Sequence, residues 1–132
     1  MGYGVGGDGS VAPEGGSSPV RLSHLRPGVP CVHVQGRLDD AAVPGFQHLV
    51  RGLLDAAPWA VVLDLRALTG LAPGAVAALV ELARHAGEAD IGLYLVAVDR
   101  PVARALAAGG VHRLFEIHRS VDSALRAMSR RP

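Results

Sequence analysis

Apolar residues recur at helical spacing in four segments of the chain. The longest stripe places its members at i, i+3, i+4, i+7, i+8 and i+11: Phe46, Leu49, Val50, Leu53, Leu54 and Ala57. The same kind of spacing recurs over residues 76–83, 102–106 and 121–128. Because side chains three and four residues apart lie on one face of a helix, each segment is predicted to be an amphipathic α-helix.

The two C-terminal helices also carry residues typical of helix boundaries. Pro101 suits the first turn of a helix, where its missing amide hydrogen is not needed, and Gly109-Gly110 suits a helix end. Ser120 is expected to be the N-cap of the last helix, and Asp122 lies where a negative charge interacts favourably with the helix dipole. These residues predict where both helices begin and where the first of them ends. Pro73 can start the second helix in the same way.

Strand patterns fill the remaining segments. Residues 20–25 (VRLSHL) and 31–36 (CVHVQG) are separated by Pro27-Gly28, which predicts a hairpin turn. The alternation in CVHVQG predicts a strand near the edge of the sheet or one with a solvated face. Nearly continuous apolar runs, typical of strands buried on both faces, occupy residues 60–65 and 91–98, and a shorter strand is expected at 114–118.

The predicted order of elements is therefore β-β-α-β-α-β-α-β-α. Crossovers between parallel strands of one sheet are almost always right-handed, so this order gives a mixed, mostly parallel sheet with packed helices. The initial hairpin contributes one antiparallel edge strand. The pattern thus predicts the α/β fold class.

Composition sets the outer limits of this picture. Residues 1–19 contain seven glycines and few large apolar side chains, so we expect a disordered tail before a single domain over residues 20–132. The net charge is +1 with scattered basic residues, which gives no indication of nucleic-acid binding. No apolar run reaches the roughly 18 residues of a membrane span. The single Cys31 and the lack of a signal-peptide pattern favour the reducing cytoplasm.

Catalytic and metal-binding patterns are not recognisable in the sequence. The serines at 23, 120, 123 and 129 lie outside the predicted strand-to-helix turns, and no G-x-S-x-G is present. Cys31 is interpreted as a small buried apolar residue. The six histidines, at 24, 33, 48, 85, 112 and 118, show no paired spacing, and a phosphate-binding P-loop is impossible without lysine. We therefore predict no metal and no cofactor.

Three carboxylates are the remaining candidates for chemistry. Asp39 and Asp40 follow the second strand, and Asp64 is expected to end the third. These acids could share a site, but structural roles are favoured: Asp40 as an N-cap and Asp64 as an acceptor for loop amides. The residues alone therefore indicate a small α/β binding module rather than an enzyme.

Four segments resemble those of a known family. GRLDDAAVPGF at residues 36–46 resembles the G-E-L-D…P…L signature before the first helix of STAS domains, the fold of bacterial anti-sigma-factor antagonists. VVLDLRALT at 61–69, ALAAGGVHRLF at 105–115 and SVDSAL at 120–125 resemble further STAS segments, in the same order. The resemblance covers roughly residues 20–128.

This resemblance implies a partner and a switch. Antagonists of this family bind an anti-sigma factor with a kinase-type ATPase fold, which phosphorylates a Ser or Thr in a D-S-S-G loop and thereby abolishes binding. In the present sequence that loop corresponds to residues 72–75, and Gly74 stands at the acceptor position. Residues 70–78 contain no hydroxyl group, so Thr69 is the nearest possible substitute acceptor.

Two functions follow from the resemblance. The first is an antagonist-like module, a monomer or weak dimer, that cannot be phosphorylated at the usual position. Its predicted partner-binding surface comprises Asp39, Asp40, Gly70, Leu71, Ala72, Pro73, Gly74 and Ala75, together with Glu81 and Arg84 on the following helix. The alternative is a STAS module that senses a small ligand, a nucleotide or a lipid, in a pocket that includes the loop 70–75.

Overall fold

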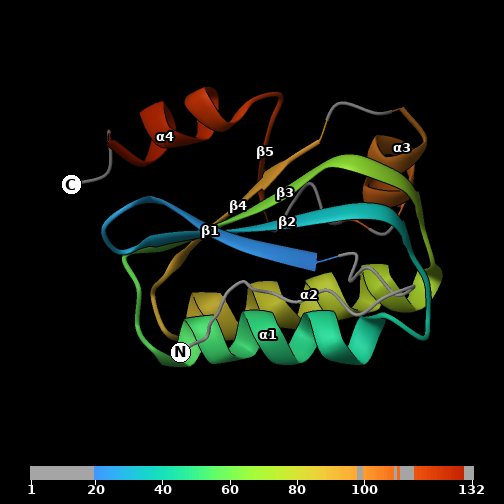
Figure 1. The fold of residues 1–132 in the computed structure, drawn as a ribbon, viewed down its shortest axis with the longest axis horizontal. Helices are drawn as coiled ribbons and strands as arrows, with labels where there is room; N and C mark the ends of the chain where they lie inside the picture. The colour runs from blue at the N-terminus through green and yellow to red at the C-terminus, as the bar shows by residue number, and fades with distance from the viewer. Residues whose placement is uncertain (1–19, 98–99, 109, 111–114, 130–132) are drawn as a thin grey trace.

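The computed structural model describes residues 20–97, 100–108, 110 and 115–129, so the predicted disordered tail over residues 1–19 lies outside it. The described residues form a five-stranded sheet in the order β1-β2-β3-β4-β5, with helices on both faces (Figure 1). The elements are β1 (Val20–Arg26), β2 (Val29–Leu38), α1 (Val43–Asp55), β3 (Ala60–Leu71), α2 (Pro73–Glu88), β4 (Gly92–Val96), α3 (Arg100–Ala108), β5 (Glu116–His118) and α4 (Val121–Ser129). The predicted order of elements and the predicted α/β class are therefore confirmed.

β1 and β2 form the predicted hairpin at one edge of the sheet. The turn includes Gly28, whose φ of +77° lies in the left-handed region that glycine adopts without a Cβ clash. β1 pairs antiparallel with β2, whereas β2, β3, β4 and β5 pair in parallel. β1 is therefore the antiparallel edge strand that the element order predicted.

The two faces of the sheet are covered unequally. On one face, α1 and α2 pack together, and their apolar stripes join side chains of α3 in the larger core, which includes Phe46, Leu79 and Leu106 (Figure 1). On the opposite face, α4 is the one helix among the described elements, and its Ala124 and Met128 pack on a smaller apolar cluster. This helix is nine residues long, so the elements that the structure describes leave part of that face uncovered, and we call this part the open face.

Local signals located several helix boundaries correctly. α2 begins at Pro73, and the Ser120 hydroxyl accepts a hydrogen bond from the Ser123 amide at 3.0 Å, as expected of an N-cap. α3 begins at Arg100, next to the predicted Pro101, and ends at Ala108. Of the glycines predicted to end it, Gly109 lies outside the described residues. Gly110 has the positive φ, +74°, that suits such a position.

Two strands extend further than predicted. β3 continues to Leu71, so Asp64 lies in the middle of the strand and not at its end. Thr69, Gly70 and Leu71 consequently belong to the strand rather than to a loop. β2 continues to Leu38 and lies inside the sheet, where the long β3 pairs with it along almost its whole length. The length of these strands depends on pairing with a neighbouring strand, and the apolar run within one segment gives no information about that pairing.

Candidate functional site

The ends of β2 and β3 meet at one edge of the sheet. The two strands pair in parallel as far as Leu38 and Leu71, and the Ala72 amide then donates a hydrogen bond to the Leu38 carbonyl at 3.0 Å. This contact fixes the start of α2 beside the chain that leads into α1. The structure therefore brings Asp39 and Asp40 alongside the predicted loop 70–75, as the partner-surface prediction requires.

Asp39 shapes the entry into α1. Its Oδ1 atom and its backbone carbonyl each accept a hydrogen bond from the Ala42 amide at 3.0 Å. The N-cap of α1 is Ala42, which makes no side-chain capping bond, so the prediction that Asp40 caps this helix is wrong. Asp39 closes the turn, so the Asp40 carboxylate is not needed there and can point elsewhere.

Asp40 instead lies against the first turn of α2. A Cβ atom added at Gly74 would lie 2.6 Å from the Asp40 Oδ1 atom, well inside van der Waals contact. The carboxylate thus occupies the space that any side chain at position 74 would enter. A negative charge at a helix N-terminus is favourable, because the first amides of the helix point their hydrogens outward. Gly74, which is predicted to stand at the family's acceptor position, therefore lies beside the Asp40 carboxylate.

The predicted surface is only partly exposed. Ala72 and Ala75 are buried, at 5% and 0% exposure, so their side chains belong to the core. Gly70 and Leu71 are half-buried. We call the exposed remainder, together with the exposed Thr69 next to it, the strand-end surface: Asp39, Asp40, Thr69, Pro73 and Gly74. Glu81 and Arg84, on the exposed side of α2, form an ion pair at 3.5 Å.

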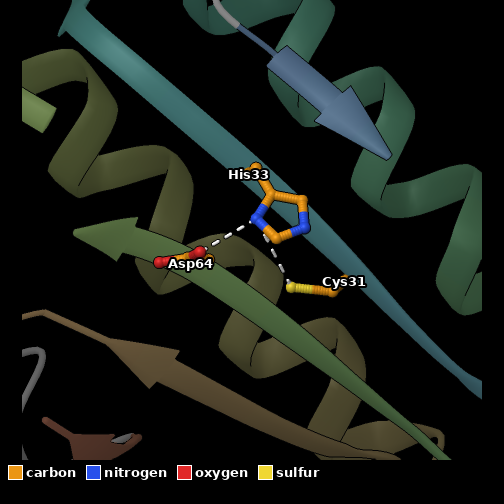
Figure 2. Close-up of side chains that lie close together, drawn as sticks. All are labelled: Cys31, His33 and Asp64. Atoms are coloured by element: carbon orange, nitrogen blue, oxygen red, sulfur yellow. Dashed lines mark hydrogen bonds and ion pairs between the residues drawn. The ribbon is translucent and has the colours of Figure 1, made fainter. Parts of the chain in front are cut away.

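A second group of polar residues lies on the open face of the sheet, beside α4. We call it the open-face cluster: Ser23, Cys31, His33, Asp64 and Arg66. His33 Nδ1 lies 2.8 Å from Asp64 Oδ2 and 4.0 Å from the Cys31 sulfur (Figure 2). His33 Nε2 lies 2.7 Å from the Ser23 hydroxyl oxygen. Arg66 donates hydrogen bonds from Nε and Nη2 to the two carboxylate oxygens of Asp64, at 2.8 and 2.9 Å.

The electrostatics of the open-face cluster follow from burial and these bonds. Burial acts to raise the pKa of Asp64, but the hydrogen bonds from Arg66 and His33 outweigh it and hold the pKa at about 2. Asp64 is therefore ionised, and its negative charge raises the pKa of Arg66 through their hydrogen bond. Burial, together with Asp64, raises the pKa of the Cys31 thiol to about 12, so the thiol stays protonated.

These charges argue against a metal ion in the open-face cluster. Cys31, His33 and Asp64 each offer a possible ligand atom, and the three atoms lie within 4.8 Å of one another. However, a thiol must lose its proton to bind a metal, and here the Asp64 carboxylate is already held by the Arg66 guanidinium. The donor set suits a hydrogen-bond network better than a metal centre.

Sequence reasoning did not find this cluster. The sequence pattern placed Ser23 outside the strand-to-helix turns and Asp64 at the end of its strand, whereas Ser23 lies beside His33 and Asp64 lies within β3. Asp64 does accept a hydrogen bond from a backbone amide, that of Arg66 at 3.2 Å, but this amide belongs to β3 and not to a loop as predicted. The hairpin pattern could have suggested that Ser23 and His33 share a face, but Asp64 joins them only through the register of β2 on β3.

A shallow hollow lies elsewhere, between the end of β1 and α4. It is lined by Arg26, Asp122, Leu125, Arg126 and Ser129. No residue of the loop 70–75 lines it, so the alternative of a small-ligand pocket at that loop stays a prediction. Across the part of the chain that the structure describes, no helix has the length and apolar character needed to cross a bilayer.

The chain is similar in sequence and fold to known proteins. The family model for the STAS domain matches residues 23–124. An anti-sigma factor antagonist from Mycobacterium paratuberculosis is 22% identical, with a TM-score of 0.73 over 83% of this chain and 92% of that one. A variant of RsbS from Moorella thermoacetica is 21% identical, with a TM-score of 0.71 over 85% and 96%.

A third structure, the phosphorylated form of the Bacillus cell fate determinant SpoIIAA, is 12% identical. Its TM-score is 0.65, over 82% of this chain and 97% of that one. A search of curated protein sequences found no match. At these identities the solved structures establish the fold alone, whereas the family model covers most of the domain.

Proposed function

The chain belongs to the STAS domain family, and on that basis we propose that it is an anti-sigma-factor antagonist-like regulatory module. Its partner would be an anti-sigma factor with a kinase-type ATPase fold. The chain would act in the cytoplasm as a monomer or weak dimer. The proposal is supported by the structural similarity to anti-sigma factor antagonists over nearly their whole length. Binding, and not catalysis, is the proposed activity.

The observation that carries this proposal is the joining of two chain segments at the strand-end surface. The hydrogen bond from Ala72 to Leu38 holds the Asp39-Asp40 turn against the first turn of α2. The result is a small acidic surface on rigid elements, extended along α2 by Glu81 and Arg84. A partner that binds there needs hydrogen-bond donors or positive charge opposite the two carboxylates.

The geometry also supports a module without the usual covalent switch. Gly74 has no hydroxyl to phosphorylate, and the Asp40 carboxylate occupies the adjacent space. A relative, SpoIIAA, has been solved in unphosphorylated and phosphorylated forms, so the modification belongs to similar proteins. Thr69 is exposed in β3 and stays the candidate for a substitute acceptor.

Titration calorimetry against purified kinase-type anti-sigma factors, with and without ATP, tests this function. We expect at least one to bind, with an affinity that does not change after incubation with ATP. Asp40→Arg should weaken that binding at least tenfold, because it reverses a charge at the centre of the proposed surface. Glu88→Arg, a charge reversal at the exposed far end of α2, is the matched control and should bind normally.

Two results would contradict the proposal separately. Equal binding by wild type, Asp40→Arg and Glu88→Arg would exclude the strand-end surface as the contact. Stoichiometric phosphate incorporation within residues 69–75, located by peptide mass spectrometry, would exclude an unswitchable module and identify Thr69 as the acceptor, since residues 70–75 offer no hydroxyl.

A further inference from the structure

Three side chains of the open-face cluster form a hydrogen-bonded line across β1, β2 and β3. The Ser23 hydroxyl lies 2.7 Å from His33 Nε2, and His33 Nδ1 lies 2.8 Å from Asp64 Oδ2. A serine, the distal nitrogen of an imidazole and a carboxylate on the proximal nitrogen are the arrangement that activates a serine nucleophile. No part of it belongs to the strand-end surface.

Strand register produces this line. In the antiparallel pair, Ser23 lies opposite Cys31, so the side chain of His33, two residues further along β2, reaches across to it on the same face. In the parallel pair, His33 lies beside Asp64. Ser23 is half-buried and the His33 side chain retains 21% exposure, whereas Asp64 is buried.

The ionised carboxylate sets the direction of the hydrogen bonds. With its pKa at about 2, Asp64 is ionised and can only accept a hydrogen bond, so His33 Nδ1 donates it. In its neutral form His33 therefore carries its hydrogen on Nδ1, and the lone pair of Nε2 faces Ser23. Two hydrogen bonds from Arg66 anchor Asp64, so the imidazole is held in the orientation that a general base requires.

We propose that Ser23 is a nucleophilic serine that accepts an acyl group from an activated donor, a thioester or an aryl ester. In this step the Ser23 oxygen forms a bond to the acyl carbon while the bond from that carbon to the leaving sulfur or oxygen breaks. The Ser23 proton passes to His33 Nε2, and the leaving group departs with the bonding electron pair and takes up that proton or one from water. The product is an O-acyl Ser23 ester.

The charges around Ser23 favour this reaction. Arg21 lies opposite His33 in the hairpin, and both Arg21 and Arg66 are near enough to lower the pKa of Cys31 by their positive charge. Positive charge beside the attacked carbonyl stabilises the negative oxygen that develops there. The Cys31 thiol does not compete, because burial keeps its pKa at about 12 and leaves it protonated.

Two other serines show what is particular to Ser23. Ser123 also lies beside a histidine, 2.8 Å from His118 Nδ1, but the carboxylate on that ring is the exposed Glu116 at 3.3 Å. Ser129 donates its hydrogen to the Leu125 carbonyl and has no histidine beside it among the described contacts. The expected order of reactivity is therefore Ser23, then Ser123, then Ser129.

The test is acetylation of the full-length chain by p-nitrophenyl acetate at pH 7.5. Release of p-nitrophenolate gives the rate, and peptide mass spectrometry locates the acetyl group. We expect Ser23 to be acetylated at least tenfold faster than Ser129 in the same molecules, a comparison that needs no variant. The rate at Ser23 should fall at least tenfold in His33→Gln, and the adduct should disappear in Ser23→Ala.

The controls separate activation from folding. Ser129→Ala should react at Ser23 as wild type does, because Ser129 bonds to the Leu125 carbonyl in α4 and takes no part in the proton path. Thermal melting and circular dichroism identify any variant that fails to fold. Acetylation of Ser23 no faster than Ser129 in the wild type would overturn the proposal, as would an unchanged rate at Ser23 in folded His33→Gln.

Discussion

The strand-end surface and the open-face cluster are built on the same two strands, yet they differ in what holds them. At the strand ends, bonds to the backbone position Asp39 and Asp40: the Asp39 carboxylate accepts from the Ala42 amide, and the exposed Asp40 carboxylate lies beside the first turn of α2. In the middle of the strands, side chains position one another. Asp64 is almost fully buried and accepts hydrogen bonds from His33 and Arg66. The end of a strand pair thus supplies an exposed surface, and its middle supplies a fixed polar network.

This difference has an energetic consequence. An exposed carboxylate such as Asp40 exchanges its neighbours for water at little cost, so replacing it changes mainly what the surface can bind. A buried carboxylate such as Asp64 leaves its partners unsatisfied when it is changed. Matched substitutions at the two positions should therefore separate binding from folding.

The largest expected difference is between Asp64→Asn and Asp40→Asn. Asp64→Asn removes the negative charge to which His33 and Arg66 bond, and we expect the free energy of unfolding to fall by about 2 kcal/mol. The loss is not larger because Arg66 is half-exposed and can bond to water instead. Asp40→Asn should change it by less than about 0.5 kcal/mol. Urea unfolding at pH 7 measures both. Equal losses would show that the two carboxylates are not held differently.

Acid should destabilise the fold through the same residue. The pKa of Asp64 is lowered from 3.8 to about 2, so its contribution is present above about pH 4 and is lost as the pH falls towards 2. This loss amounts to about 2 kcal/mol. Unfolding free energies of wild type and Asp64→Asn, measured from pH 5 down to pH 2, should converge. Parallel curves for the two proteins would contradict the assignment.

The smallest effect is expected at Gly74. In Gly74→Ser the new Cβ would lie 2.6 Å from Asp40 Oδ1, but this oxygen ends an exposed side chain that can rotate away. We expect a loss below about 1 kcal/mol, since surface substitutions of this kind are mild. Combining it with Asp40→Ala should recover about half of that loss in a double-mutant cycle. A large loss that persists in the double variant would place the clash in the backbone instead.

Much of the fold could be predicted from local patterns. The apolar stripe that includes Phe46 and Val50 predicted α1, and Pro73 and Ser120 marked the starts of α2 and α4. These signals are local, because helix periodicity and capping depend on residues within a few positions of one another. The order of elements and the resemblance to STAS domains, now confirmed, rest on the same information.

Strand ends and caps were predicted less well. The apolar run suggested that β3 ends near Leu65, whereas pairing with β2 carries it through Gly70 to Leu71. Likewise, Asp40 has a residue type suited to capping α1, but Asp39 makes the local bond and Asp40 lies against Gly74. Neighbours distant in sequence decided both outcomes.

The sequence by itself determined the element order and the family, and it predicts that Gly74 stands at the family's acceptor position. The tertiary structure alone decided that Ser23, His33 and Asp64 form one hydrogen-bonded line, although 10 and 31 residues separate them. The physical reason is register: a shift of one residue in either strand pair would turn one side chain to the opposite face of the sheet. Register is set by the packing of the whole sheet and not by any of its strands alone.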